Sequence, residues 1–240
     1  MKEERYFYVP NAAEGKELPE EEATHAVRVL RLSEGDTIWL MDGVGNFYRA
    51  DVGMVTKKRC LYNIVETLRQ QKTWSGKIHL AIAPTKMMER IEWMAEKSTE
   101  IGFDELTFLD CKFSERHVIR IDRIERIVVS AMKQSRKAFM PVVNELTAFK
   151  DFVTSCNADY KFIAHCYNDR ERVDFFDRLK SLPVDAAVCV LIGPEGDFSF
   201  DEVELARANG FEPITLGNSR LRTETAGLMA VTMAQIQKRM

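Results

Sequence analysis

The 240-residue sequence lacks the usual marks of a membrane, secreted or zinc-binding protein. Its five cysteines are odd in number and scattered, and no two form a CxxC pair, so neither a disulfide framework nor a zinc site is indicated. No apolar run approaches the length needed to cross a bilayer, and Met1–Arg5 lacks the apolar core of a signal peptide. We therefore expect a cytoplasmic protein that binds neither a membrane nor a metal.

The sequence also lacks an excess of basic residues and the common phosphate-binding loops. Its formal net charge is −3 and its pI is about 5.9, so an RNA-binding protein of this composition would have to gather its cations on one face. Neither a GxGxxG motif nor a Walker-type loop with its lysine is present, which argues against a phosphate-binding α/β enzyme. Hydrophobic residues make up 45% of the chain, which is enough for a globular core.

Residues 1–70 are predicted to be rich in β-structure. Pro19 and three acidic residues favour a short helix over 18–29. The predicted strands are 5–9, 37–41, 46–55 and 60–68. Several short strands with tight turns suggest a small barrel, and the polar segment 71–77 is predicted to be a linker.

Residues 78–240 alternate between predicted strands and helices. The predicted strands are 78–83, 106–109, 160–165, 188–192 and 214–216, with 141–144 short and extended. The predicted helices are 86–101, 121–138, 147–156, 173–182 and two more near the C-terminus. Strands separated by helices imply a mostly parallel sheet, and ligands bind at the carboxyl ends of the strands in such sheets.

Two polar loops follow the last two predicted strands. In the first, Gly193 and Gly196 precede a helix whose start has a capping box, Ser199 with Glu202. The second loop, 217–226, leads into a last helix with an apolar stripe. That stripe consists of Ala226, Met229, Met233, Ile236 and Met240. Taken as a pattern alone, this region also fits an ordinary βαβα segment with well-made turns.

The two loops carry a pair of motifs, Gly-Pro-Glu-Gly-x-Phe-Ser at 193–199 and Leu-Gly…Leu-Arg-Thr-Glu-Thr-Ala at 216–226. At this separation they resemble the 16S ribosomal RNA uracil-N3 methyltransferase family, in the SPOUT class of knotted methyltransferases. Segments 25–31, 96–102 and 134–141 match further parts of the family pattern. The resemblance implies an α/β fold with a SPOUT-type parallel sheet and a C-terminal trefoil knot, preceded by a PUA-like RNA-binding β-barrel. Neither periodicity nor spacing indicates the knot.

The resemblance also implies a cofactor, S-adenosylmethionine, and a set of site residues. The expected cofactor-binding residues are His165, Ile192, Gly193, Pro194, Glu195, Gly196, Leu216, Gly217, Leu221, Arg222, Thr223, Thr225 and Ala226. The expected catalytic residues are Arg222, for charge on the uracil oxygens, and Glu224. The expected RNA-binding residues are Arg5, His25, Arg28, Arg31, Lys133 and Arg136. The identity of the base that removes the N3 proton stays open between carboxylates such as Glu195 and Glu224.

Two positions depart from the family pattern. Asp197 stands where the family usually has a second glycine, and Ser219-Arg220 stands where it usually has Arg-Ile. The implied partners are 16S ribosomal RNA in the small ribosomal subunit and a second copy of the chain. The last helix is expected to supply either that dimer interface or internal core. The alternatives are a ribose 2′-O-methyltransferase of the same class and a non-catalytic RNA-binding protein.

Overall fold

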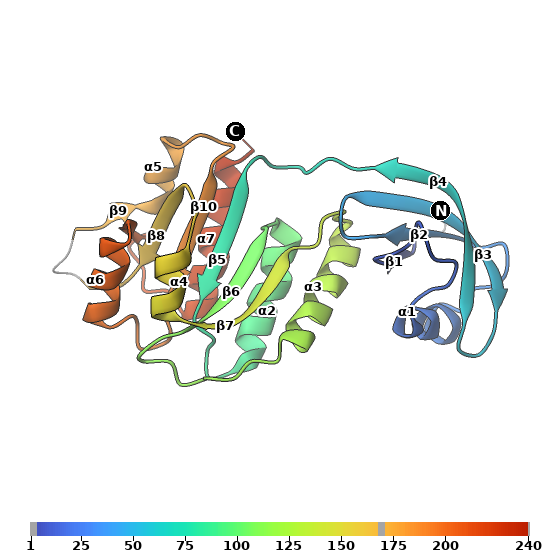
Figure 1. Cartoon of the computed structure of the whole chain (residues 1–240), viewed down its shortest axis with the longest axis horizontal. Coiled ribbons are helices and arrows are strands. Elements are labelled where there is room, and N and C mark those ends of the chain that lie inside the picture. The colour runs from blue at the N-terminus through green and yellow to red at the C-terminus, as the bar shows by residue number, and fades with distance from the viewer. Residues whose placement is uncertain (1–3, 168–170, 240) are drawn as a thin grey trace. The chain divides into compact units, whose positions relative to one another are not determined.

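The computed structural model describes residues 4–167 and 171–239, which fold into two compact units (Figure 1). Unit 1 takes the described residues up to Lys72 together with Val129–Met140. Unit 2 takes Thr73–Val128 and the described residues from Pro141 onward. The middle segment joins unit 1 because Met132 and Ala138 pack with Met41 and Phe47 in one buried cluster.

Unit 2 is built on a seven-stranded sheet in the order β7-β6-β5-β10-β8-β11-β9, and every pair in it is parallel. The strands are β5 Lys77–Ile82, β6 Glu105–Asp110, β7 Val142–Ala148, β8 Tyr160–Ala164, β9 Val173–Asp174, β10 Ala187–Ile192 and β11 Phe211–Thr215. The predicted parallel sheet is thereby confirmed. Residues 188–192 of the central strand β10 are buried, as expected of a strand covered by helices on both faces.

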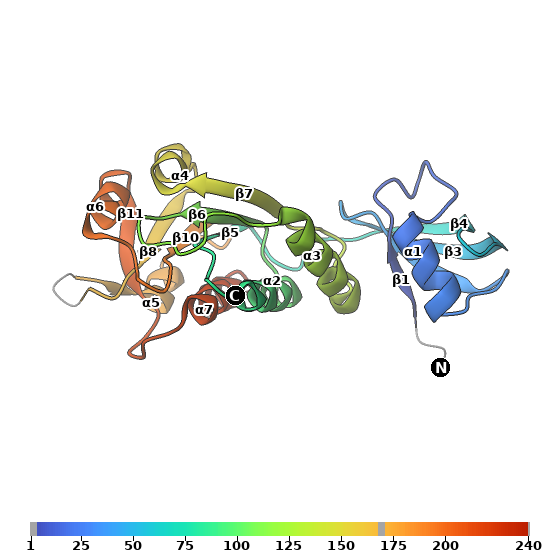
Figure 2. The same cartoon turned by 90° about the horizontal axis from the view of Figure 1, so that it is seen from below.

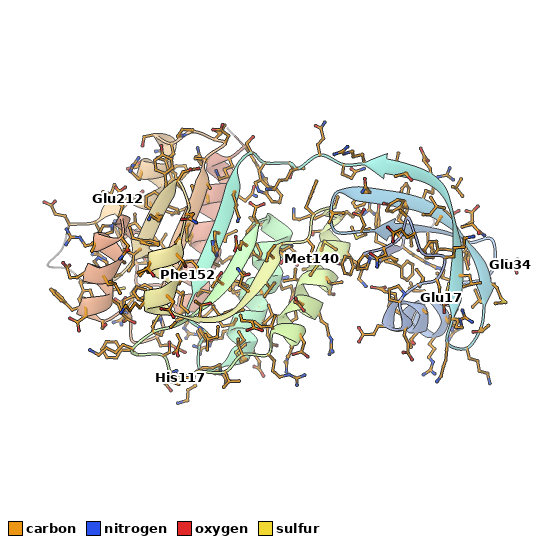
Figure 3. The ribbon with its side chains drawn as sticks, in the orientation of Figure 1. Glu17, Glu34, His117, Met140, Phe152 and Glu212 are labelled. Atoms are coloured by element: carbon orange, nitrogen blue, oxygen red, sulfur yellow. The ribbon has the colours of Figure 1, made fainter. Side chains whose placement is uncertain are left out.

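Helices cover both faces of this sheet. They are α2 Met88–Ile101, α4 Phe149–Ser155, α5 Phe175–Lys180, α6 Phe200–Ala208 and α7 Thr223–Gln237. A further helix, α3 Ile121–Ser135, belongs to unit 2 in its first half and to unit 1 in its second. Figure 2 shows α4 and α6 on one face and α2, α5 and α7 on the other. Phe152 of α4, labelled in Figure 3, packs with Val203 of α6 and Leu191 of β10. No helix among the described residues has the length and apolar character that a membrane span requires.

Helix α7 lies unusually close to the sheet. A Cβ atom at Gly227 would come within 2.9 Å of Ile82 Cδ1, so only glycine fits there without a shift. The buried apolar residues of α7 include Ala230, Val231 and Ala234, whereas Met229 is 36% exposed and Ile236 45% exposed. The predicted apolar stripe therefore does not form internal core, and Met240 lies outside the described residues.

Several predicted helix boundaries were wrong. The predicted helix 147–156 starts as strand, because Thr147 and Ala148 still pair with Leu109 and Asp110. The predicted helix 173–182 begins only after β9, where the Asp174 carboxylate caps α5. In contrast, the capping box of Ser199 with Glu202 at the start of α6 is confirmed.

Unit 1 contains a four-stranded sheet in the order β1-β2-β3-β4. Its strands are β1 Tyr6–Tyr8, β2 Thr37–Met41, β3 Asn46–Val55 and β4 Cys60–Arg69. Only the β1–β2 pair is parallel, and β1 and β4 are not paired within the described residues. A further antiparallel bridge, between Glu17 and Leu61, lies on the outer edge of β4. Closure of unit 1 into the expected small barrel stays a prediction. The predicted helix 18–29 is a short α-helix, α1 Glu20–Thr24, that continues as a π-helix, η1 His25–Val29.

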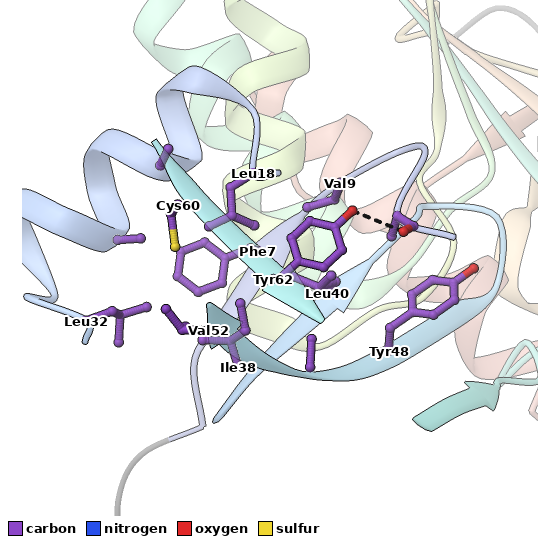
Figure 4. Close-up of a cluster of buried hydrophobic side chains, with 14 residues drawn as sticks. Phe7, Val9, Leu18, Leu32, Ile38, Leu40, Tyr48, Val52, Cys60 and Tyr62 are labelled. Atoms are coloured by element: carbon purple, nitrogen blue, oxygen red, sulfur yellow. Dashed lines mark hydrogen bonds between the residues drawn. The ribbon is translucent and has the colours of Figure 1, made fainter. Parts of the chain in front are cut away.

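Unit 1 has its own hydrophobic core (Figure 4). Phe7 of β1, Leu40 of β2 and Tyr62 of β4 are all nearly completely buried. The Tyr62 hydroxyl donates a hydrogen bond to the Ala12 carbonyl at 3.0 Å, so its polar end is satisfied inside the core. This core shares no residue with the buried cluster of the unit 2 sheet.

Candidate functional site

The loops that follow the strands of unit 2 lie at the carboxyl edge of its sheet, because all the strands run the same way, and four of these loops follow neighbouring strands. Residues 83–87 follow β5 and residues 165–167 follow β8. We call Gly193–Ser199, after β10, the first loop and Leu216–Arg222, after β11, the second loop. Strands β5, β10, β8 and β11 are neighbours in this order, so the structure brings together the loops that carry the paired sequence motifs.

The first loop is fastened to both neighbouring loops. The Glu195 carboxylate accepts a hydrogen bond from the Lys86 backbone N–H at 3.0 Å. The Asp197 carboxylate accepts one from the Cys166 backbone N–H at 2.8 Å. The Tyr167 hydroxyl donates to the Phe198 carbonyl at 2.7 Å. These long-range contacts hold the backbone of the first loop in one conformation.

Asp197 adopts the left-handed conformation that a glycine would favour, with φ +67°. Aspartate tolerates this region better than most residues. Its second carboxylate oxygen accepts a hydrogen bond from the Phe198 N–H at 2.8 Å. The departure from the family pattern at this position therefore keeps the glycine-like backbone and adds a bond to the loop after β8.

Gly193 sits where the first loop folds back on itself. A Cβ atom there would lie 3.0 Å from the Phe198 backbone nitrogen, closer than ordinary contact. Gly193 and Pro194 are buried, whereas Glu195 and Gly196 are exposed. The turn thus needs a residue without a side chain, and it presents backbone groups at the edge of the sheet.

The second loop is more open. Gly217 has φ +112° and is exposed, as is Arg220, and the Thr215 hydroxyl donates to the Gly217 carbonyl at 2.8 Å. Helix α7 follows, with Arg222 at its N-cap but no side-chain cap bond. Thr223 and Glu224 turn inward and are buried, so a carboxylate lies beneath the exposed loop.

A hollow of about 630 Å³ lies between α2 and the end of the second loop. It is lined by Glu89, Arg90, Trp93, Arg220, Leu221, Arg222, Glu224 and Thr225. Four of these residues, Leu221, Arg222, Glu224 and Thr225, belong to the predicted site, and none comes from the first loop. Sequence reasoning missed Glu89, Arg90 and Trp93. The signal that could have found them is Trp93, a large aromatic residue in the predicted helix 86–101 that lies between the apolar residues Ile91 and Met94.

Glu224 has an unusual environment in this hollow. The residue is 7% exposed, and its Oε2 atom has no hydrogen-bond partner among the described residues. Arg90 Nε lies 3.8 Å from Oε1, too far for a hydrogen bond. A buried carboxylate oxygen without a donor costs free energy, and such groups are concentrated at functional sites and at ligand positions.

His165 lies inside the protein at the end of β8 and does not line the hollow. Its Nδ1 atom accepts a hydrogen bond from the Tyr167 N–H at 3.2 Å, and its carbonyl accepts one from Arg172 at 2.7 Å. The ring supports the 165–167 loop, which in turn binds Asp197 of the first loop.

The predicted RNA-binding residues all belong to unit 1. His25, Arg28 and Arg31 lie on or just after η1 and are exposed. Lys133 instead forms an ion pair with the buried Glu22. Arg136 pairs with Glu4 at 2.9 Å and lies over the Tyr6 ring at 5.2 Å. Arg5 contributes its carbonyl to the sheet, where it accepts from the Trp39 N–H.

A second hollow, of about 480 Å³, lies at the amino edge of the same sheet. Its polar residues bond to one another. His79 Nε2 is 2.8 Å from the Thr107 hydroxyl, and Asn144 donates to both Glu105 and Thr107 at 2.7 and 2.8 Å. Burial lowers the pKa of His79 to about 4, so its ring is neutral at pH 7.

Cys156 is a free cysteine that lines this second hollow. Its sulfur accepts a hydrogen bond from the Cys189 thiol, which together with the Ala158 backbone lowers the pKa of Cys156 to about 6. Across both hollows and the rest of the described chain, no three histidine, cysteine or acidic side chains gather as a metal site would require.

Two family models match the chain. The RNA methyltransferase domain matches residues 72–235, and the RNA methyltransferase PUA domain matches residues 18–65. The first match covers the whole seven-stranded sheet and both loops, and the second covers most of the four-stranded sheet.

Individual proteins agree with these matches. Ribosomal RNA small subunit methyltransferase E of Synechocystis is 30% identical over 87% of this chain and 68% of its own length. A probable rRNA-methyltransferase from Porphyromonas gingivalis has a crystal structure with a TM-score of 0.91, 42% identity and 98% coverage of both chains. The crystal structure of ribosomal RNA small subunit methyltransferase E from Neisseria gonorrhoeae, bound to S-adenosyl methionine, has a TM-score of 0.82, 26% identity and 98% coverage of both chains.

Proposed function

Because the chain belongs to the RNA methyltransferase family, we propose that it transfers a methyl group from S-adenosylmethionine to N3 of a uridine in 16S ribosomal RNA. The observation that carries this proposal is the hollow at the carboxyl edge of the sheet, which Arg222 and the buried Glu224 both line. The relatives named for small-subunit RNA methylation supply the substrate class. A substrate in the small ribosomal subunit implies that the enzyme works in the cytoplasm.

The two loops are suited to hold the cofactor. The first loop turns at the buried Gly193 and is exposed at Glu195 and Gly196, and the second loop is exposed around Gly217. We assign the cofactor to these loops and to Thr223, Thr225 and Ala226 at the start of α7, with Ile192, Leu216 and Leu221 supplying apolar contacts. We also propose that the chain forms the trefoil knot of the SPOUT class here. When bound, S-adenosylmethionine supplies an electrophilic methyl group, and the protein supplies position and charge.

Arg222 and Glu224 provide the chemistry at the uracil. The Glu224 carboxylate accepts the proton from N3, whose lone pair then forms the new N–C bond while the methyl–sulfur bond breaks and its electrons stay on sulfur. The Arg222 guanidinium stabilises the negative charge that develops on the neighbouring carbonyl oxygens. The unpartnered oxygen of Glu224 supports its role as the proton acceptor.

We propose that unit 1 holds the RNA through the exposed cations His25, Arg28 and Arg31. Positive side chains bind phosphates and position an RNA without reading its sequence. Arg5, Lys133 and Arg136 would add to this surface. Lys133 would do so only partly, because Glu22 already neutralises it.

We further propose that the enzyme is a homodimer whose interface includes the outer face of α7. Met229 and Ile236 are exposed apolar residues on that face, and Met233 lies between them. Burying such a stripe against a second copy is favourable. Size measurement of a Met229→Glu/Ile236→Glu variant tests this point, and a wild-type-like dimer would contradict it.

Product analysis tests the proposed reaction. Small ribosomal subunits that lack the modification are incubated with the enzyme and methyl-labelled S-adenosylmethionine, and the RNA is digested to nucleosides. Label in N3-methyluridine is expected. Label in a 2′-O-methyl nucleoside would favour the ribose methyltransferase alternative, and the absence of transfer would favour a non-catalytic RNA-binding protein.

Calorimetric titration with S-adenosylmethionine tests the cofactor assignment. Gly193→Ala should weaken binding at least about tenfold, because its new Cβ atom meets the Phe198 backbone at 3.0 Å and moves the loop. Gly53→Ala is the matched control, since a Cβ atom there meets nothing closer than 3.5 Å. Unchanged affinity in the Gly193 variant would remove the first loop from the cofactor site.

A further inference from the structure

We propose that the 630 Å³ hollow between α2 and the second loop is the binding site of one unstacked pyrimidine base, with Trp93 as its stacking surface and Arg90 as a donor to one of its carbonyl oxygens. The inference rests on the proposed function and adds the residues that hold the base and select its type. A base inside an RNA fold must leave its stack to meet a reactive group, so the enzyme needs a site of this kind.

Trp93 offers a flat apolar face to the hollow. It belongs to α2, lines the hollow and is 43% exposed. Its neighbours on α2, Ile91, Met94 and Ala95, face the interior and are fully buried. The indole therefore plays no part in the core, and stacking on aromatic side chains is how proteins commonly hold an unstacked base.

The polar groups of the hollow match the edge of uracil. That edge presents an N3–H donor between two carbonyl acceptors. The hollow is lined by Glu224, whose carboxylate can accept a hydrogen bond, and by Arg90 and Arg222, whose guanidinium groups can donate. Cytosine has an acceptor at N3 beside an amino donor, so it would set its N3 lone pair against the carboxylate. The arrangement favours an imide-bearing base over cytosine.

Arg90 is placed to contact a ligand and not only Glu224. Its side chain is 33% exposed, and its Nε atom stays 3.8 Å from Glu224 Oε1. At that distance the guanidinium donors are not committed to the carboxylate. A bound uracil carbonyl can take an Arg90 donor while the imide N–H approaches Glu224, which has an oxygen without a donor.

Three substitutions of Trp93 separate stacking from simple filling of space. Trp93→Ala is expected to lower kcat/KM for unmodified small subunits about 30-fold or more, with S-adenosylmethionine affinity unchanged. Trp93→Phe, which keeps an aromatic face, should restore activity to within about threefold of wild type. Trp93→Leu, which keeps apolar bulk without that face, should stay low. Phe200→Ala, which removes another exposed aromatic residue (50% exposed, against 43% for Trp93) that does not line the hollow, is the matched control.

The outcomes distinguish the base site from the reaction itself. A wild-type enzyme that forms no N3-methyluridine overturns the proposed function, and the base site with it. If the wild-type enzyme forms N3-methyluridine and the Trp93→Ala variant is equally active, only the base site is overturned. Equal rescue by Trp93→Leu and Trp93→Phe overturns stacking as the role of the residue.

Arg90→Gln tests the donor. We expect a loss of about tenfold or more in kcat/KM together with weaker discrimination against a particle that carries cytidine at the target position. Unaltered activity and discrimination would overturn the role of Arg90. Thermal unfolding of each variant is followed in parallel, because a loss of activity counts only where the melting temperature stays close to that of the wild type.

Discussion

The two edges of the seven-stranded sheet each bear a hollow lined with polar side chains, yet they differ in how those side chains are paired. At the amino edge, His79, Glu105, Thr107 and Asn144 bond to one another. At the carboxyl edge, Glu224 keeps an oxygen without a partner, and Arg90 stands 3.8 Å away from it. Polar composition alone does not distinguish the edges. The difference is whether the polar groups satisfy one another or leave a buried carboxylate oxygen without a donor.

The largest expected effect comes from exchanging one carboxylate at each edge. Glu224→Gln should lower the methylation rate by about 10²- to 10⁴-fold, the range typical for loss of a proton-transfer group. Glu105→Gln, at the amino edge, should leave the rate close to wild type. Single-turnover assays on unmodified small subunits compare the two variants. Similar methylation rates for both variants would show that the functional edge of the sheet cannot be identified from whether its polar side chains are hydrogen-bonded to one another.

The amino edge should make the protein sensitive to acid. Burial holds the pKa of His79 near 4, below the 6.5 of an unfolded histidine, so the unfolded chain binds the extra proton between these values. Stability is therefore intact above pH 6.5 and falls as the pH drops towards 4, by about 3 kcal/mol at roughly 1.4 kcal/mol per pKa unit. Urea unfolding at a series of pH values measures this, and His79→Gln should remove most of the slope.

The hydrogen-bonded side chains at the amino edge, His79, Glu105, Thr107 and Asn144, should contribute to the stability of the protein and not to its activity. Asn144→Ala removes donors to Glu105 and Thr107 and should lower the free energy of unfolding by about 1–3 kcal/mol. Arg222→Ala, at the other edge, removes an exposed side chain without a cap bond and should change it by less than about 0.5 kcal/mol. Denaturant titration compares the two. If Arg222→Ala lowers the free energy of unfolding more than Asn144→Ala does, the proposed difference between the two edges is wrong.

The smallest expected effect concerns thiol reactivity. With its pKa lowered to about 6, Cys156 should react with iodoacetamide at pH 7 about tenfold faster than the exposed Cys166, whose pKa is raised by desolvation of its sulfur and by Asp197. Peptide mass spectrometry after brief labelling gives the two rates. Cys189→Ala removes the main hydrogen bond to Cys156 and should slow its labelling. Faster labelling of Cys166 would contradict the assignment.

Much of unit 2 could be predicted from sequence because its signals are local. Apolar runs indicated the strands, and the Ser199–Glu202 capping box fixed the start of α6. The paired motifs also identified Leu221, Arg222, Glu224 and Thr225, which do line one hollow. These predictions depend on residues close together in the chain, whose backbone preferences already determine the local structure.

What the sequence did not reveal depends on distant contacts. The outward orientation of Met229 and Ile236 follows from Gly227 fitting against Ile82, which no local pattern indicates. Arg90 and Trp93 join the site only because α2 packs beside α7. The pairing of Lys133 with Glu22 likewise joins residues far apart in the chain. In each case the position or pairing of a residue depends on a second residue that is distant in the sequence.

The carboxylates of the first loop also have a consequence for motion. Glu195 and Asp197 accept hydrogen bonds from the amides of Lys86 and Cys166, which belong to two other loops. If the first loop opens, both amides lose their protection in the same event. Hydrogen–deuterium exchange at the Lys86 and Cys166 amides should therefore proceed at correlated rates. The three loops would then open together as one cooperative unit, although they are far apart in the sequence.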